Sequence, residues 1–192
     1  FIGINHCVAT ANCTSALMLA IKALNIIDGE ALIPSFTFPA TAHAVHWNNL
    51  KITLVDCDSR TFNMSVDDLQ EKVTSKSKMV IPVHVFGNPC DAKAIDEVAK
   101  DKGLSVIYDA AHAFGAKQNG VSVGRFGDAE VFSGSPTKAF TTVEGGIVAT
   151  NDAEIAEKVR IGRNYGQRGD YNCEMLGLNA RMSELHATVG LN

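Results

Sequence analysis

The sequence has little of what marks several large protein classes. Its five cysteines form no CxxC pair and are odd in number, which fits reduced cytoplasmic thiols better than a disulfide framework or a zinc site. No apolar run approaches the roughly 20 residues that span a bilayer. The run at 16–27 contains Lys22 and is typical of a buried helix. The first residue is Phe1 and no signal-peptide pattern follows, so we expect the central part of a longer cytoplasmic protein.

An excess of basic residues is also missing. The chain has 17 Lys and Arg against 21 Asp and Glu, and its net charge is −4. Without a basic cluster, neither nucleic acid nor an anionic membrane is an expected partner. No GxGxxG, GK[ST] or HExxH motif occurs, which removes the usual dinucleotide, nucleoside triphosphate and zinc-protease classes.

Two further motifs invite a function and do not support it. Asp56 and Asp58 lack a third ligand at a suitable spacing, so loop capping is predicted and no metal site. The segment 120–124 matches G-x-S-x-G, a motif that needs a strand before it and a helix after it. Asn119–Gly120 is a strong hairpin turn, and no helix pattern follows, so the match is rejected.

The hydrophobic content of 46% is enough for the core of one α/β domain. Short apolar runs alternate with helical patterns as far as residue 115, which predicts right-handed βαβ units and a mainly parallel sheet. We expect strands at 31–33, 51–55, 79–83, 105–108, 130–132 and 146–149. We expect helices at 16–27, 40–47, 91–102 and 152–165, with another opening at 65–69.

Polar residues follow two of these strands. Asp109 and His112 come after the strand at 105–108. The strand at 130–132 is followed by four more: Ser133, Ser135, Thr137 and Lys138. The carboxyl ends of strands are where α/β sheets bind ligands. A lysine amine can condense with an aldehyde and a buried carboxylate can keep a pyridine nitrogen protonated, so the pair predicts a pyridoxal phosphate (PLP) site. Separately, such a lysine is usually a surface charge and such an aspartate a helix cap.

Other segments offer further parts of such a site. Asn12–Ser15 precede a helical pattern, and a helix start with free amides and hydroxyls can hold a phosphate, although an ordinary cap would look the same. Phe36 and Phe38 precede the helix at 40–47, where an aromatic ring can stack on a planar cofactor or belong to the core. His84 is interpreted as a hydrogen-bonded structural residue near the site.

The runs DAAHAFGA, FSGSPTK, EGGIVATND and GLNARMSEL resemble the DegT/DnrJ-type aminotransferases, fold-type I PLP enzymes that mostly make amino sugars on nucleotide carriers. The resemblance covers essentially the whole chain. It implies a three-layer α/β/α fold with a mainly parallel mixed sheet. It also implies that residues 1–192 form the PLP-binding large domain, with the small C-terminal domain outside this chain.

The resemblance also assigns roles to residues. Lys138 binds the cofactor aldehyde and transfers protons, Asp109 pairs with the pyridine nitrogen, and His112 lies beside the ring. Phe38 covers the ring, and three hydroxyl residues hold the phosphate: Thr14, Ser15 and Ser133. Either Asn179 or Arg181 contacts the cofactor phosphate of a partner chain, in a homodimer with shared active sites.

The implied activity is transamination of a keto group on a nucleotide-linked deoxysugar, with glutamate as amino donor and dTDP, UDP or GDP as carrier. A few relatives are PLP-dependent sugar dehydratases and carry histidine at the position of Lys138, so this lysine favours transamination. The same fold would also suit a different fold-type I PLP enzyme, or a non-catalytic protein with a regulatory or assembly role. Gly134, Ser135 and Pro136 depart from the usual family residues, which affects substrate details and not Lys138.

Overall fold

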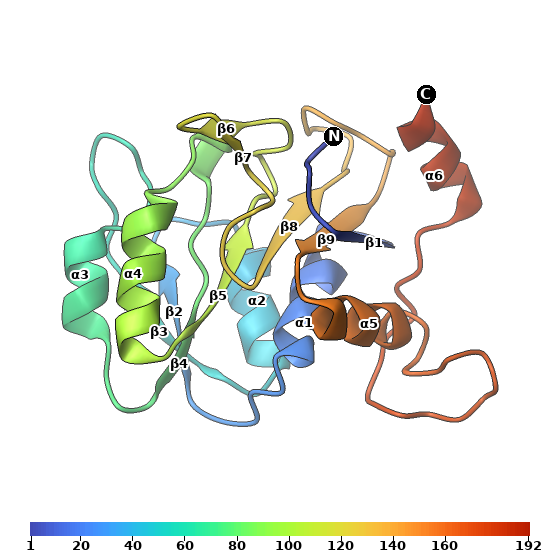
Figure 1. The fold of residues 1–192 in the computed structure, drawn as a ribbon, viewed down its shortest axis with the longest axis horizontal. Coiled ribbons are helices and arrows are strands. Elements are labelled where there is room, and N and C mark those ends of the chain that lie inside the picture. The colour runs from blue at the N-terminus through green and yellow to red at the C-terminus, as the bar shows by residue number, and fades with distance from the viewer.

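The computed structural model describes all of residues 1–192 and shows a seven-stranded sheet between two layers of helices (Figure 1). The strand order is β1-β9-β8-β5-β4-β2-β3. β9 pairs antiparallel with β1 and β8, and all other pairs in this seven-stranded sheet are parallel. The strands are β1 (His6–Thr10), β2 (Glu30–Pro34), β3 (Lys51–Val55), β4 (Ser77–Val80), β5 (Ser105–Asp109), β8 (Ala129–Ser133) and β9 (Gly146–Thr150). The predicted mainly parallel mixed sheet is therefore confirmed.

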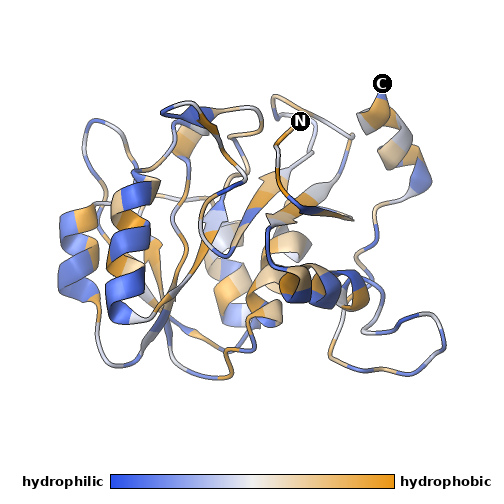
Figure 2. Cartoon of the chain, viewed as in Figure 1, coloured by the Kyte–Doolittle hydropathy of each residue, from blue (hydrophilic) through white to orange (hydrophobic).

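Alternate residues of the strands face the two helix layers. Ala31 and Ile33 pack in a core with α1 (Cys13–Ala23), α2 (Pro39–Trp47) and α5 (Ala153–Gly162). Leu32, between them, packs in a core with α3 (Val66–Lys72) and α4 (Ala92–Lys102). The three-layer α/β/α prediction is confirmed, and α3 and α4 show the blue and orange bands of amphipathic helices (Figure 2).

Local signals explain where the helices begin and end. The side chain of Asn12 accepts a hydrogen bond from the Ser15 amide at 2.8 Å and caps α1. Pro39 occupies the first turn of α2, and Gly103 ends α4 with a φ of 65°. The predicted helix at 16–27 is wrong at both ends: α1 starts at Cys13 and stops at Ala23, before the left-handed Asn25.

Several other boundaries differ from the expectation. The strand expected at 79–83 is β4 at Ser77–Val80, and the chain leaves it near Pro82, which has no N–H for a sheet ladder. The helix expected at 152–165 ends at Gly162. Three elements were missed: β1, the short 3-10 helix η1 (Val85–Gly87) and α6 (Glu184–Leu191). The hairpin at Asn119–Gly120 is present between β6 (Lys117–Gln118) and β7 (Val121–Ser122).

The topology places β5 and β8 side by side with both carboxyl ends at one edge of the sheet. α1 starts after β1, and α2 starts after β2, so the N-terminal turns of both helices lie at that same edge. This edge is where a ligand site is expected in such folds. None of the helices is long and apolar enough to cross a membrane.

Candidate active site

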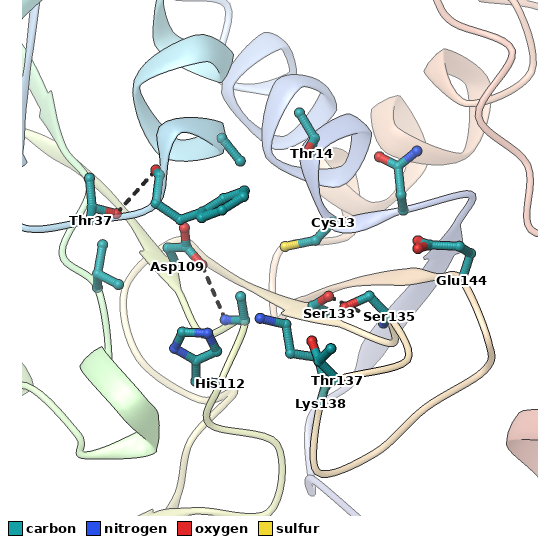
Figure 3. A pocket seen from close by; sticks show the side chains of 15 residues that line it. Cys13, Thr14, Thr37, Asp109, His112, Ser133, Ser135, Thr137, Lys138 and Glu144 are labelled. Carbon is teal, nitrogen blue, oxygen red and sulfur yellow. Dashed lines mark hydrogen bonds between the residues drawn. The ribbon is translucent and has the colours of Figure 1, made fainter.

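A cavity of about 340 Å³ opens at this edge, between the starts of α1 and α2 and the loops after β5 and β8 (Figure 3). Several of its residues were predicted from the sequence, and they come from distant segments of the chain. The lining consists of Asn12, Cys13, Thr14, Thr37, Phe38, Ala40, Val83, Asp109, Ala111, His112, Ser133, Ser135, Thr137, Lys138 and Glu144.

Asp109 is the last residue of β5, and only 4% of its surface is exposed. The Thr41 hydroxyl donates to Oδ2 at 2.8 Å, and the Ala111 amide donates to Oδ1 at 3.1 Å. Burial raises the pKa of Asp109, while these two donors lower it. No salt bridge involves Asp109. It is a buried carboxylate at a cavity wall, held by neutral donors and without a cation.

Lys138 lies in the loop after β8, where its amide donates to the Ser135 carbonyl at 3.1 Å. Its side chain extends into the cavity toward His112 and Asp109 (Figure 3). Burial and the positive charge of Lys138 lower the pKa of His112, and the negative charge of Asp109 opposes that shift. The cavity thus brings together an amine, an imidazole favoured in its neutral form, and a buried carboxylate.

The hydroxyl groups gather beside the start of α1. Thr14 lies in its first turn and lines the cavity together with Ser133, the last residue of β8, and with Ser135 and Thr137 of the loop that follows. Ser15, also predicted to hold phosphate, does not line this cavity: its amide donates to the Asn12 side chain, and its hydroxyl donates to the Asn12 carbonyl at 2.9 Å. Hydroxyls and the amides of a helix N-terminus suit an anion such as a phosphate group.

Of the two aromatic candidates, Phe38 lines the cavity and Phe36 does not. Phe38 lines the cavity and is 74% exposed, so one face of its ring is available for stacking. Phe36 is 47% exposed and contacts Phe62 and Phe86 with centroid distances of 5.6 and 6.2 Å. Neither ring belongs to the core.

Asn179 and Arg181 lie outside this cavity. Asn179 lines an adjoining hollow that shares Thr14 and Glu144 with it. The Arg181 guanidinium lies over the Tyr165 ring, 5.9 Å from its centroid, in a separate hollow rich in arginine. Within one chain, neither side chain lines the cavity that contains Lys138.

Sequence reasoning missed four contributors. Cys13 lines the cavity, where burial and the charge of Asp109 raise the pKa of its thiol and Lys138 opposes them. Thr41 binds Asp109, and Thr37 binds Thr41; their i, i+4 spacing at a helix start could have indicated a shared face. Glu144, the first residue of the EGGIVATND run, also lines the cavity.

Comparisons with known proteins agree over the whole chain. The model of the DegT/DnrJ/EryC1/StrS aminotransferase family matches residues 1–192. The chain is 40% identical over 191 residues to the dTDP-4-amino-4,6-dideoxy-D-glucose transaminase of Shigella dysenteriae, covering 100% of this chain and 52% of that protein. It is 42% identical over 189 residues to the UDP-N-acetyl-3-dehydro-alpha-D-glucosamine 3-aminotransferase of Acidithiobacillus ferrooxidans, covering 97% and 51%.

Solved structures give the same picture. DesI, crystallised with its TDP-sugar product, superposes with a TM-score of 0.92 and 40% identity, covering 99% of this chain and 48% of DesI. The PLP form of the sugar aminotransferase Spr1654 from Streptococcus pneumoniae gives 0.93 and 25% identity, covering 100% and 55%. The chain spans about half the length of the curated relatives that it matches.

Proposed function

The chain belongs to the DegT/DnrJ/EryC1/StrS aminotransferase family, and from this we propose that it is the PLP-binding large domain of a nucleotide-sugar aminotransferase. The reaction would convert a keto group of a nucleotide-linked deoxysugar into an amine, with glutamate as amino donor. One observation carries the proposal: Asp109, buried and without a salt bridge, lies in the same cavity as the amine of Lys138.

The residues present fit PLP. When bound, PLP supplies an aldehyde that condenses with amines and a ring that withdraws electrons from the reacting carbon. Asp109 would hold the ring nitrogen protonated, and the positive charge of the pyridinium would compensate the buried carboxylate. Thr14 and Ser133 would hold the phosphate, with Ser135 and Thr137 within the same lining.

The other residues would move protons and shape the site. The Lys138 amine would anchor the cofactor and then accept the proton from the α-carbon of the amino donor. His112, favoured in its neutral form, would donate a hydrogen bond or accept one beside the ring. Phe38 would cover one face of the ring and exclude water from it.

The sugar substrate class follows from the relatives, whose names specify dTDP- and UDP-linked sugars. Asn179 and Arg181 do not line the cavity of their own chain, and we propose that one of them contacts a partner's cofactor phosphate in a homodimer. All five cysteines are free thiols, which supports a cytoplasmic location for the protein.

The test uses the full-length protein loaded with PLP. Borohydride reduction followed by peptide mapping should place the pyridoxyl label on Lys138, and glutamate should convert the bound PLP absorbance into that of pyridoxamine phosphate. A label on another lysine would remove Lys138 from its role. A dehydratase would instead release a deoxygenated sugar without an amino group, and a non-catalytic relative would show no spectral change with glutamate.

A further inference from the structure

A chain of hydroxyl groups ends at the Asp109 carboxylate. Thr41 Oγ1 donates to Asp109 Oδ2 at 2.8 Å, and Thr37 Oγ1 lies 2.7 Å from Thr41 Oγ1. Thr41 is fully buried, whereas Thr37 lines the cavity beside Asp109 (Figure 3). Thr41 itself is absent from the cavity lining, so it reaches a bound ligand only through Asp109.

The two hydrogen bonds that join Thr37, Thr41 and Asp109 are donated in the same direction, toward the carboxylate. A threonine hydroxyl has a single proton. Because Thr41 donates that proton to Asp109, the 2.7 Å bond between the two hydroxyls needs the proton of Thr37, whose other acceptor, the Phe38 carbonyl, is more distant at 3.5 Å. Both O–H dipoles therefore point toward the carboxylate, and hydrogen bonds in such a row polarise one another. This arrangement favours the charged form of Asp109 over a carboxyl protonated on Oδ2.

The helix that carries Thr41 also favours the charged form of Asp109. α2 begins at Pro39, so Thr41 belongs to its first turn, and its amide bonds to the Phe38 carbonyl at 3.2 Å. The hydrogen bond from Thr41 places this turn against Asp109. The positive end of a helix stabilises a nearby carboxylate.

We propose that Thr41, supported by Thr37, is a positioning residue that orients the Asp109 carboxylate and stabilises its negative charge. The inference rests on the proposed function, in which Asp109 pairs with a pyridine nitrogen. Burial raises the pKa of Asp109, and the bond from Thr41 is the largest of the effects that lower it. The titratable groups around Asp109 are His84, His112, Cys13 and Cys90, with Lys138 in the same cavity.

The test measures the titration of Asp109 directly. Full-length protein freed of cofactor and labelled with ¹³C-aspartate is titrated by infrared spectroscopy, and the Asp109 band is assigned by its loss in Asp109→Asn. In Thr41→Val the protonated carboxyl band should persist to higher pH than in the wild type, because one donor to the charged form is lost. Thr41→Ser keeps the hydroxyl and should titrate like the wild type. Thr37→Val should shift the band in the same direction by less.

Thr150→Val is the matched control. Thr150 is also buried, and its hydroxyl donates to the Asp128 carbonyl at 2.6 Å, so the variant loses a buried hydrogen bond far from Asp109. It should leave the Asp109 titration unchanged. If the Asp109 band titrates at the same pH in Thr41→Val and in the wild type, the inference is overturned. If Thr41→Val does not fold, Thr37→Val is measured in its place, and an unchanged Asp109 titration in that variant overturns the inference. Because the titration needs no cofactor, its failure is distinct from a failure of Lys138 labelling.

Discussion

His84 Nε2 lies 3.2 Å from Glu130 Oε2, and both side chains are completely shielded from solvent. The Cys90 amide donates to His84 Nδ1, so the ring carries its proton on Nε2 and donates it to the carboxylate. The His84 amide donates to the Asp109 carbonyl at 3.0 Å. The pair thus connects β8, which carries Glu130, to the strand end that presents Asp109, as expected for a hydrogen-bonded structural histidine.

Breaking this buried pair should destabilise the protein strongly. His84→Ala leaves the Glu130 carboxylate buried with only the Phe126 amide as donor, at a cost of about 3–5 kcal/mol in the free energy of unfolding. Urea denaturation followed by circular dichroism measures it. Glu97→Ala is the control, because the Lys93–Glu97 pair is exposed and should contribute at most about 0.5 kcal/mol. Similar losses in both variants would contradict the structural role of His84.

Asp109→Ala should separate folding from chemistry. The variant loses the negative charge beside the ring without touching Lys138, so it should fold and bind some PLP. Turnover should fall by orders of magnitude, because the ring no longer withdraws electrons effectively. Steady-state kinetics with absorbance of the bound cofactor measures both properties. Turnover close to wild type would remove Asp109 from the site.

Gly146→Ala should weaken cofactor binding through the backbone. A Cβ at Gly146 would collide with the carbonyl of Asn12, the residue that caps α1. Moving either segment displaces the start of α1 from the hydroxyls of the facing loop. Gly120→Ala is the control, because nothing lies within 4 Å of a Cβ there, although its φ of 83° adds some strain. PLP titration should show a larger loss of affinity for Gly146→Ala, and equal losses would contradict the close approach.

The sequence was sufficient for the fold where side-chain periodicity is strong. Buried strands such as Ser105–Asp109 combine apolar runs with turn residues, and α4 combines an Asp91 cap with Gly103 at its end. β1 was missed because its sequence, HCVAT, shows no alternation of apolar and polar residues: the two buried positions are Val8 and the polar Thr10, and only the pairing with β9 identifies it as a strand. α6 was missed because none of its residues is buried in this chain, so its sequence has no apolar face of the kind that indicates a packed helix.

For the site, sequence reasoning located the groups that a motif carries, such as Asp109 and Lys138, and the cavity contains both. It could not locate Thr41, because the bond to Asp109 joins positions that only the sheet topology brings together. It also could not show that the amide and the hydroxyl of Ser15 both donate hydrogen bonds to Asn12. Partners of buried polar groups depend on tertiary packing, which local spacing does not encode.

Mixed dimers should test whether two chains share each active site. In full-length protein, Lys138→Ala and Arg181→Ala should each lose activity, and a mixture of the two should regain part of it, because one site of the mixed dimer has both intact residues. Asn179→Ala in place of Arg181→Ala identifies which side chain makes the contact. Activity assays after subunit exchange provide the measurement, and no recovery with either variant would show that each chain builds its site alone.

Asp109→Asn should make the cofactor-free protein more stable at neutral pH. Burial raises the pKa of Asp109 above its ordinary 3.8, so the folded chain binds this proton up to a higher pH than the unfolded chain. Between those two pKa values the folded state holds more protons, and the free energy of unfolding therefore falls as pH rises. Above the folded-state pKa the full cost of the buried charge is present.

Asparagine has a similar shape and no charge to bury, so its advantage should grow as pH rises above 3.8 toward the folded-state pKa of Asp109, and should disappear as pH falls toward 3.8. Urea denaturation of wild type and variant across this range measures it. With PLP bound the order should reverse, because the pyridinium pairs with the Asp109 carboxylate and compensates its burial. A cofactor-free variant less stable than wild type at pH 7 would mean that neighbouring donors already compensate the buried charge, and that Asp109 does not need a cationic ligand.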